Sequence, residues 1–422
     1  MRLAGAKRMK TGRIGLALAG GGPEGAVYEI GALRALDEAI EGIDLNDLAV
    51  YVGVSAGAFV GACLANGITP TQLCQAMTEG PGERRFSPEI FFTPAIHEYV
   101  RRALVAPQRL AAVIWNWLRP GPDGSLIRSV VRLADALPLG IFDNEPIRRY
   151  LEGIFSVEGR TDDFRRLRRP LIVVAADLDS GQARRFGEPG SDHVPISKAI
   201  QASSAMPGLY PPVLIEGRYY VDGVLLKTMH ASVPLDAGVG LVICVNPLVP
   251  INMNATNAPK DVVPSRQLTD LGLPMVLSQT FRTFIHSRLS VGMAAYAPRY
   301  PEQDVVLFEP RRDDYRMFFS NTLSFSSRKS ICQHAYDVTR CDLLARFDEL
   351  APIFERQGLN LRRDVLEDRE RDLWAGVGLP QARSSYVTDE LDRALTRLEA
   401  YIANEDDTAG RAMDCVEPIS VS

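Results

Sequence analysis

Short, continuous apolar runs recur along the chain and predict the strands of a buried sheet. They lie at residues 14–19, 48–54, 171–178, 239–246 and 304–308. Runs without polar alternation are typical of strands that are covered on both faces. Apolar residues at helical spacing follow the first run, and small residues at helical spacing follow the second. The pattern therefore predicts an α/β fold with a largely parallel central sheet flanked by helices.

A glycine-rich loop and a serine turn follow the first two predicted strands. Residues 20–25 read Gly-Gly-Gly-Pro-Glu-Gly, and residues 53–57 read Gly-Val-Ser-Ala-Gly around Ser55. A G-x-S-x-G turn between a strand and a helix holds the serine hydroxyl away from the backbone. Because parallel strands end at the same edge of a sheet, we expect the two loops to lie side by side. Backbone N–H groups of the glycine loop would then form an oxyanion hole next to Ser55.

Two further motifs follow in the order seen in a known family. Residues 203–212 form a segment of small residues with a Pro-rich end, and residues 219–223 read Tyr-Tyr-Val-Asp-Gly. Together with the two loops, they make residues 13–225 resemble the patatin-like phospholipase family. The resemblance implies a catalytic dyad in which Ser55 is the nucleophile and Asp222 is the general base. In this arrangement the N–H groups of Gly21 and Gly22 are expected to stabilise the oxyanion.

Two positions depart from the pattern of that family. Glu24 stands where the family usually carries a basic residue, and Val224 stands where a small residue usually follows Asp-Gly. An acid that points toward the oxyanion would oppose it, and a larger side chain could crowd the base. These departures keep open a non-catalytic, patatin-like protein that binds lipid or a partner.

Two other classes of protein share parts of this pattern. Gly20, Gly22 and Gly25 fit a dinucleotide-binding fingerprint, but Asp44 precedes the second strand and Pro23 removes an N–H from the phosphate cradle. An α/β-hydrolase with a Ser-Asp-His triad is formally available, because histidines follow Asp222 in the chain. The histidines of the chain are His97, His193, His230, His286 and His334.

The charge and the cysteine content of the chain limit which ligands and partners are expected. The 422 residues carry a net charge of −5, which argues against a general nucleic-acid binder. The six cysteines are scattered without C-x-x-C spacing, so neither a zinc site nor a disulfide framework is expected. Asp177 and Asp179 favour a turn over a metal site. No metal or organic cofactor is expected, and no oligomeric state follows from the pattern.

The apolar segments are too short to cross a bilayer, which needs about 20 apolar residues. The N-terminus is basic, but cleavage of the short apolar run after it would remove the glycine-rich loop. We therefore expect a cytoplasmic protein with possible peripheral contact at the membrane.

The segment from 89 to 140 interrupts the α/β rhythm and predicts a helical insertion. Its residues 91–137 combine Trp115 and Trp117 with Arg101, Arg102 and Arg109. Tryptophan beside an arginine-bearing amphipathic helix suits a lipid headgroup layer. The segment is accordingly a candidate for peripheral membrane contact, and packing on the core is the alternative.

The domain organisation and the reaction follow from these motifs. A patatin-like acyl hydrolase domain is expected over residues 13–345, and a helical, charged C-terminal extension with a disordered end over residues 346–422. The expected reaction is cleavage of fatty acyl esters, of the phospholipid or lysophospholipid class, through an acyl-Ser55 intermediate. Acyl transfer to an acceptor other than water would use the same residues.

Overall fold

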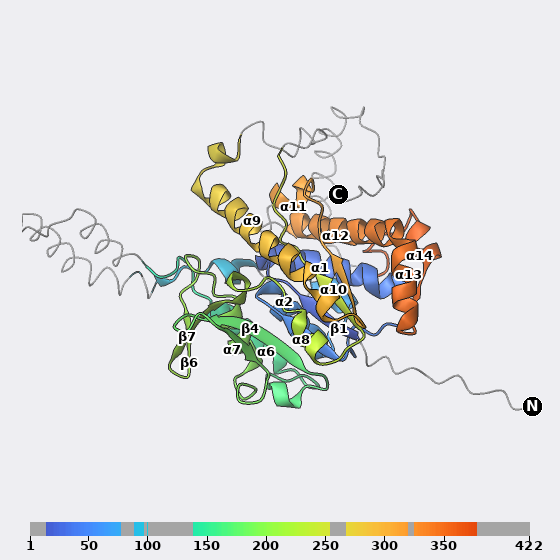
Figure 1. Cartoon of the computed structure of the whole chain (residues 1–422). Helices are drawn as coiled ribbons and strands as arrows, with labels where there is room; N and C mark the ends of the chain where they lie inside the picture. Colours follow the sequence, from blue (N-terminus) through green and yellow to red (C-terminus); the bar gives the residue numbers. More distant parts are fainter. Residues whose placement is uncertain are drawn as a thin grey trace, which may run out of the picture.

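The computed structural model describes residues 14–76, 88–96, 99, 138–253, 267–319 and 325–377. Within these residues, an eight-stranded mixed sheet forms the centre of the molecule (Figure 1). Its strands are β1 (Ile14–Leu18), β3 (Val50–Gly53), β4 (Leu171–Asp177), β5 (Ala183–Phe186), β6 (Val213–Ile215), β7 (Arg218–Asp222), β8 (Leu241–Val245) and β9 (Asp304–Phe308). The order is β6-β7-β4-β3-β1-β8-β9, and β5 also pairs with β4. The predicted α/β fold with a largely parallel sheet is confirmed.

Six strands run in one direction, and two run in the opposite direction. β4, β3, β1, β8 and β9 are joined by parallel pairing, whereas β5 and β7 pair antiparallel with β4, and β6 pairs antiparallel with β7 and so runs in the direction of β4. The all-apolar strands β1 and β8 lie in the middle, where every residue is buried. Polar residues occur in strands nearer the edges: β5 carries two arginines, β7 begins with Arg218 and β9 begins with Asp304. Continuous apolar strands thus occupy the positions that are covered on both sides.

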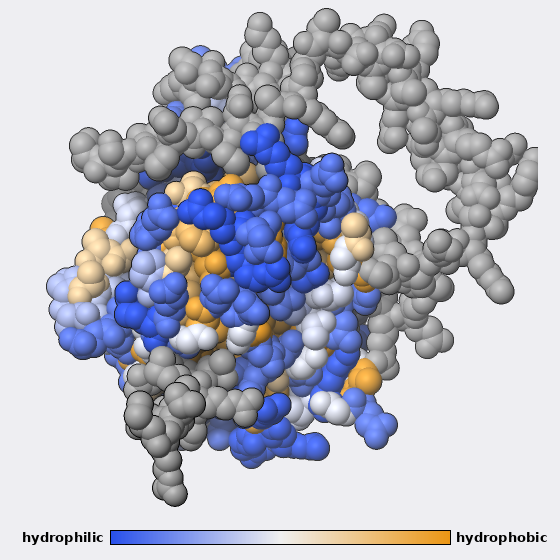
Figure 2. Space-filling view, turned by 90° about the vertical axis from the view of Figure 1, so that its right-hand side faces the viewer, coloured by the Kyte–Doolittle hydropathy of each residue, from blue (hydrophilic) through white to orange (hydrophobic). Residues whose placement is uncertain are grey.

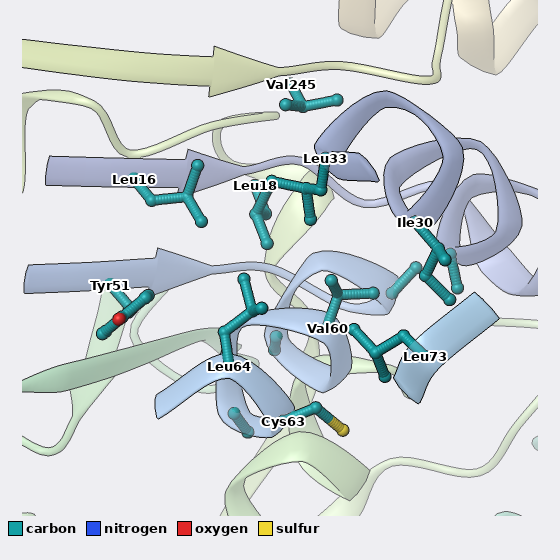
Figure 3. Packing of buried hydrophobic residues seen from close by; sticks show 14 of the residues in the cluster. Leu16, Leu18, Ile30, Leu33, Tyr51, Val60, Cys63, Leu64, Leu73 and Val245 are labelled. Atoms are coloured by element: carbon teal, nitrogen blue, oxygen red, sulfur yellow. The ribbon is translucent and has the colours of Figure 1, made fainter. Parts of the chain in front are cut away.

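The two faces of the sheet are covered by hydrophobic cores of different size. On one face, Leu16 and Leu18 of β1 contact the larger core (Figure 3). This core is built by α1 (Gly22–Ala39), α2 (Ala56–Ala65), α3 (Pro70–Ala76), α6 (Glu145–Phe155), α7 (Ile196–Ser203) and α12 (Phe325–Ala345). On the other face, Ala17 and Val52 contact a smaller core. That core is covered by α8 (Ser232–Asp236), α9 (Leu273–Ala294) and α10 (Tyr296–Arg299).

The pairing along β4 determines which loops meet. On one side β4 pairs with β5, from Val173 to Ala176. On its other side β4 pairs with β3 up to Val173, opposite Gly53, and then with β7 from Ala175, opposite Asp222. Since β7 runs antiparallel, its end and the end of β3 approach each other along the same strand. The turn that follows β3 therefore meets the turn that follows β7.

The C-terminal helices share the larger core. α13 (Phe347–Arg356) and α14 (Arg363–Glu367) bury Leu350, Phe354 and Leu366 in it, and β10 (Asn360–Leu361) pairs with β2 (Ile40–Glu41). These elements lie beside α1 (Figure 1), on a face of the molecule that is mainly hydrophilic (Figure 2). The start of a separate C-terminal extension at residue 346 stays a prediction, and residues 378–422 lie outside the described part.

Close packing of α1 against α12 explains the position of Gly31. A β-carbon at Gly31 would collide with the carbonyl oxygen of Cys332. The two helix backbones approach each other as closely as this because the residue has no side chain.

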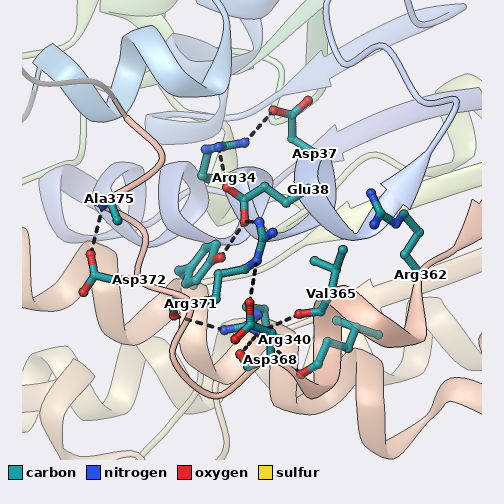
Figure 4. Close-up of polar contacts among 12 residues, drawn as sticks. Arg34, Asp37, Glu38, Arg340, Arg362, Val365, Asp368, Arg371, Asp372 and Ala375 are labelled. Atoms are coloured by element: carbon teal, nitrogen blue, oxygen red, sulfur yellow. Dashed lines mark hydrogen bonds and ion pairs between the residues drawn. The ribbon is translucent and has the colours of Figure 1, made fainter.

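A buried acid ties α1 to the C-terminal helices (Figure 4). Glu38 accepts hydrogen bonds from the Tyr336 hydroxyl at 2.6 Å and from Arg371 at 2.9 Å, and it forms an ion pair with Arg34. Arg340 donates to the backbone oxygens of Val365 and Asp368 from the same side. One carboxylate thus joins side chains from three separate parts of the chain.

Little of the predicted insertion falls within the described residues. Its flanks include the short helix η1 (Pro88–Phe92) and a bridge between Pro94 and Phe142. Trp115, Trp117 and the three arginines of residues 101–109 lie outside the described part. Within that part, no helix combines the length and the apolar character needed to cross a bilayer.

The remaining short helices are η2 (Phe164–Arg166), η3 (Gly223–Leu225), η4 (Leu268–Leu271) and α11 (Tyr315–Phe319). Of these, η3 matters for the site, because it follows β7 directly.

Replacing Glu38 by Ala should lower the free energy of unfolding by about 2–3 kcal/mol, because it leaves Arg34 and Arg371 without their shared carboxylate. Urea denaturation followed by circular dichroism would measure the loss. Asp364→Ala is the control, since its ion pair with Arg362 is exposed and should contribute less than about 0.5 kcal/mol. Equal losses in the two variants would contradict the role of Glu38.

Candidate active site

Ser55 occupies a strained turn between β3 and α2. Its backbone has φ 53° and ψ −119°, a left-handed φ that residues other than glycine rarely adopt. The flanking glycines make the turn possible: a β-carbon at Gly53 would collide with the backbone of Ala58, and one at Gly57 would lie 2.5 Å from the carbonyl carbon of Leu18. The G-x-S-x-G pattern thus reflects close backbone approach on both sides of Ser55.

The hydroxyl of Ser203 holds this turn in place. The Ser55 N–H donates to the Ser203 Oγ at 2.8 Å, and the Ser203 hydroxyl donates to the Val174 carbonyl oxygen of β4 at 2.6 Å. The sequence pattern placed Ser203 in a segment of small residues without assigning it this contact. Ser203 is buried at the end of α7, and a buried hydroxyl needs hydrogen-bond partners. This burial, which the sequence did not show, would have pointed to the contact.

Asp222 is the last residue of β7 and is buried beside Ser55. Its N–H donates to the Ala205 oxygen at 3.0 Å, and its Oδ1 accepts from the Val224 N–H at 2.9 Å. The Ser55 side chain lies close enough to the carboxyl to lower its pKa. A β-carbon at Gly223 would collide with the Val174 carbonyl oxygen, so glycine lets the chain turn tightly after Asp222. The structure therefore brings Ser55 and Asp222 together, from turns that lie 167 residues apart in the sequence (222 − 55).

Burial dominates the electrostatics of Asp222. It raises the pKa of the carboxyl to about 7, although the hydrogen bonds from Val224 and Ser55 lower it. A carboxyl with this pKa exchanges its proton near neutral pH, as a general acid or base requires.

The glycine-rich loop lies against the same serine. A β-carbon at Gly20 would lie 3.2 Å from the Ser55 Cβ, and one at Gly21 would lie 2.6 Å from Pro247. Gly22 has φ +62° and opens helix α1. Among the described residues, no acceptor takes the N–H of Gly21 or Gly22. These two donors stand at a helix N-terminus, where the backbone favours negative charge.

Both departures from the family pattern have a defined place. Val224 is buried next to Gly20, and its N–H orients the Asp222 carboxyl. Glu24 lies in the first turn of α1 and forms an ion pair with Arg282 of α9. In this arrangement Val224 supports the carboxyl of Asp222 through its backbone.

The described histidines interact elsewhere. His193 pairs with Glu216, His286 with Glu309 and His334 with Asp314. His230 is buried, and burial with the nearby cations Lys227 and Arg185 lowers its pKa to about 3. None of these four contacts Ser55 or Asp222 through a hydrogen bond within the described residues, and His97 lies outside them.

The model of the family described as "Patatin-like phospholipase" matches residues 16–237, which is more than half of the chain. The chain belongs to the patatin-like phospholipase family. The match spans both loops and Asp222 of this patatin-like protein.

Three solved structures illustrate what this patatin-like protein is similar to. VipD from Legionella pneumophila is 19% identical over 55% of this chain and 49% of its own, with a TM-score of 0.30. The type III effector ExoU is 14% identical over 82% of this chain and 53% of its own, with a TM-score of 0.28. ExoU in its complex with SpcU, from the type III secretion system of Pseudomonas aeruginosa, is 14% identical over 82% of this chain and 58% of its own, with a TM-score of 0.24. The chain thus spans about half the length of these structures.

Asp222→Asn should make the protein more resistant to heat at pH 8 than at pH 5, relative to the wild type. The pKa of the carboxyl is about 4 in an unfolded chain and about 7 in the folded one, so the folding stability of the wild type falls as pH rises from about 4 to about 7. Asparagine carries no charge and keeps an oxygen for the Val224 N–H. Thermal denaturation should show a gain in Tm of at least about 2 °C at pH 8 and a smaller gain at pH 5. The same gain at both pH values would contradict the raised pKa.

Proposed function

We propose that this protein is a serine acyl hydrolase that cleaves fatty acyl esters of the phospholipid or lysophospholipid class. The observation that carries the proposal is the meeting of the Ser55 hydroxyl with the buried Asp222 carboxyl beside the glycine-rich loop. Family membership supports a lipid as the substrate.

In the first step, Asp222 takes the proton of the Ser55 hydroxyl while Oγ attacks the acyl carbonyl carbon. The tetrahedral intermediate then expels the alcohol, which takes the proton from Asp222, and leaves the acyl chain on Ser55. In the second step Asp222 removes a proton from water, whose oxygen attacks the acyl carbon. Collapse of this intermediate releases the fatty acid and returns the proton to Ser55. A pKa of about 7 suits a group that both accepts and returns a proton.

The N–H groups of Gly21 and Gly22 would stabilise the oxyanion in both steps. The Ser55 N–H is already bonded to Ser203, which leaves the glycine-rich loop as the better source of donors. The loop is held near its required position by Pro247, which packs against Gly21 and Gly25.

Two other functions make different use of the same fold. A non-catalytic lipid- or partner-binding protein would not need the Ser55–Asp222 contact, and a triad would need a histidine at Asp222. The contacts of the four described histidines favour the dyad.

We further propose peripheral contact with a lipid surface at the base of the insertion. Ile96, Ile141 and Leu209 are 63%, 47% and 46% exposed. They lie on one hydrogen-bonded patch, because Ala95 bonds to Ile141 and Phe142 bonds to Leu209. Leu209 follows the Ala205 segment that bonds to Asp222, so the patch is connected to the site. Exposed apolar groups of this kind favour insertion into a headgroup layer.

Ser55→Ala should abolish hydrolysis of a short-chain p-nitrophenyl ester, and Asp222→Asn should lower the rate by roughly 10²-fold or more. Labelling with a fluorophosphonate should modify Ser55 in the wild type, as seen by mass spectrometry of the peptide. Glutamine variants of His230, His286 and His334 should keep the activity. Near wild-type turnover by Ser55→Ala would refute the proposal, and a loss as large as that of Asp222→Asn in one histidine variant would indicate a triad.

Ser55→Ala protein should sediment with anionic phosphatidylglycerol vesicles at low salt, and the pair Ile96→Ser and Ile141→Ser in that background should reduce the bound fraction severalfold. The Ala background prevents hydrolysis of the vesicles during the assay. Leu214→Ser is the matched control, because Leu214 is an equally exposed apolar residue on β6. Absence of vesicle binding by the Ser55→Ala protein would rule out the membrane contact.

A further inference from the structure

Glu24 places a negative charge in the helical turn that directly follows the proposed oxyanion hole. It lies in the first turn of α1, two residues after Gly22, and its side chain is 24% exposed. An anion near the N–H groups of Gly21 and Gly22 raises the energy of a second anion that forms there. Hydrolysis by this site therefore needs a way to offset the charge of Glu24.

Arg282 supplies an opposite charge from a distant part of the chain. Its Nη2 lies 3.6 Å from the Glu24 Oε2, and its side chain is 13% exposed. Burial lowers the pKa of the guanidinium, and the charge of Glu24 raises it again. The residue belongs to α9, which begins after the family match ends at residue 237.

The surroundings of α9 hold Arg282 next to the glycine-rich loop. Arg282 and Pro247 line the same small pocket, and Pro247 packs against Gly21 and Gly25. The Gln279 side chain bonds to both the N–H and the oxygen of Ile251, at 3.1 and 2.7 Å. One turn beyond Arg282, the Ile285 oxygen accepts the Thr228 hydroxyl at 3.2 Å. These contacts fix the helix on both sides of Arg282.

We propose that Arg282 is a positioning residue of the active site, which neutralises Glu24 so that the glycine-rich loop can bind the oxyanion. This proposal rests on the proposed hydrolase function and extends it to a residue outside the segment that matches the family. Arg282 acts through Glu24 and does not itself contact the substrate. The basic group at this loop thus comes from α9 in place of the loop itself.

The proposal predicts a specific pattern in a double-mutant cycle. Arg282→Gln should lower kcat for a soluble ester by about tenfold or more, because Glu24 loses the positive charge of Arg282. Glu24→Gln alone should leave kcat within about threefold of the wild type. The double variant, Glu24→Gln with Arg282→Gln, should regain most of the lost rate. A residue that served only to pack α9 would not be rescued by a second substitution.

Two further variants serve as controls, and the rate of fluorophosphonate labelling is a second measurement. Arg282→Lys keeps the charge and should keep most of the activity, and Arg288→Gln removes an exposed cation of the same helix as a matched control. The rate of fluorophosphonate labelling at Ser55 should follow kcat, since that reaction also builds negative charge beside the loop. Thermal denaturation of each variant shows whether it folds.

The outcomes separate this proposal from the hydrolase proposal itself. If Ser55→Ala abolishes activity but the cycle shows no rescue, Arg282 acts on the substrate or on packing, and the inference is overturned. An unchanged kcat in Arg282→Gln overturns it as well. If Ser55→Ala retains activity, the hydrolase proposal fails first.

Discussion

The backbone ladder of β4 is the constraint on which the candidate site depends. One side of this strand holds the end of β3 at Val173 and the end of β7 at Ala175. Because the two strands run toward each other, their following turns share one position in space. Ser55 and Asp222 meet there, and Ser203 bonds to Val174 between these two pairing positions. A slip of the pairing by one residue would turn the side chains to the other face.

The site combines features that cost stability with contacts that compensate for them. The left-handed φ of Ser55 and the buried carboxyl of Asp222 are both unfavourable in isolation. Hydrogen bonds from the Ser55 N–H to Ser203, and from the Val224 N–H to Asp222, hold each residue in its strained or buried state. The larger core on one face of the sheet provides the rigid support that such an arrangement requires.

Residues beyond the family match complete the structure around the site. α12 packs against α1 at Gly31, and Glu38 bonds to Tyr336 and Arg371. α9 covers the other face and contacts Glu24 through Arg282. The helix that opens behind the glycine-rich loop is therefore held by partners from the second half of the chain.

The sequence by itself determined the parallel strands, the two loops and Ser55 as a candidate, because continuous apolar runs and glycines at tight turns are local signals. Asp222 became a candidate through the resemblance of its Asp-Gly motif to that of the family. It did not reveal β5 and β6, since an Ala-Arg-Arg-Phe strand and a three-residue strand carry no such signal. Nor did it reveal the contacts of Ser203 or the pairing of Glu24 with Arg282. These depend on residues 148 and 258 positions apart in the chain (203 − 55 and 282 − 24), and only the tertiary structure decides which distant groups become neighbours.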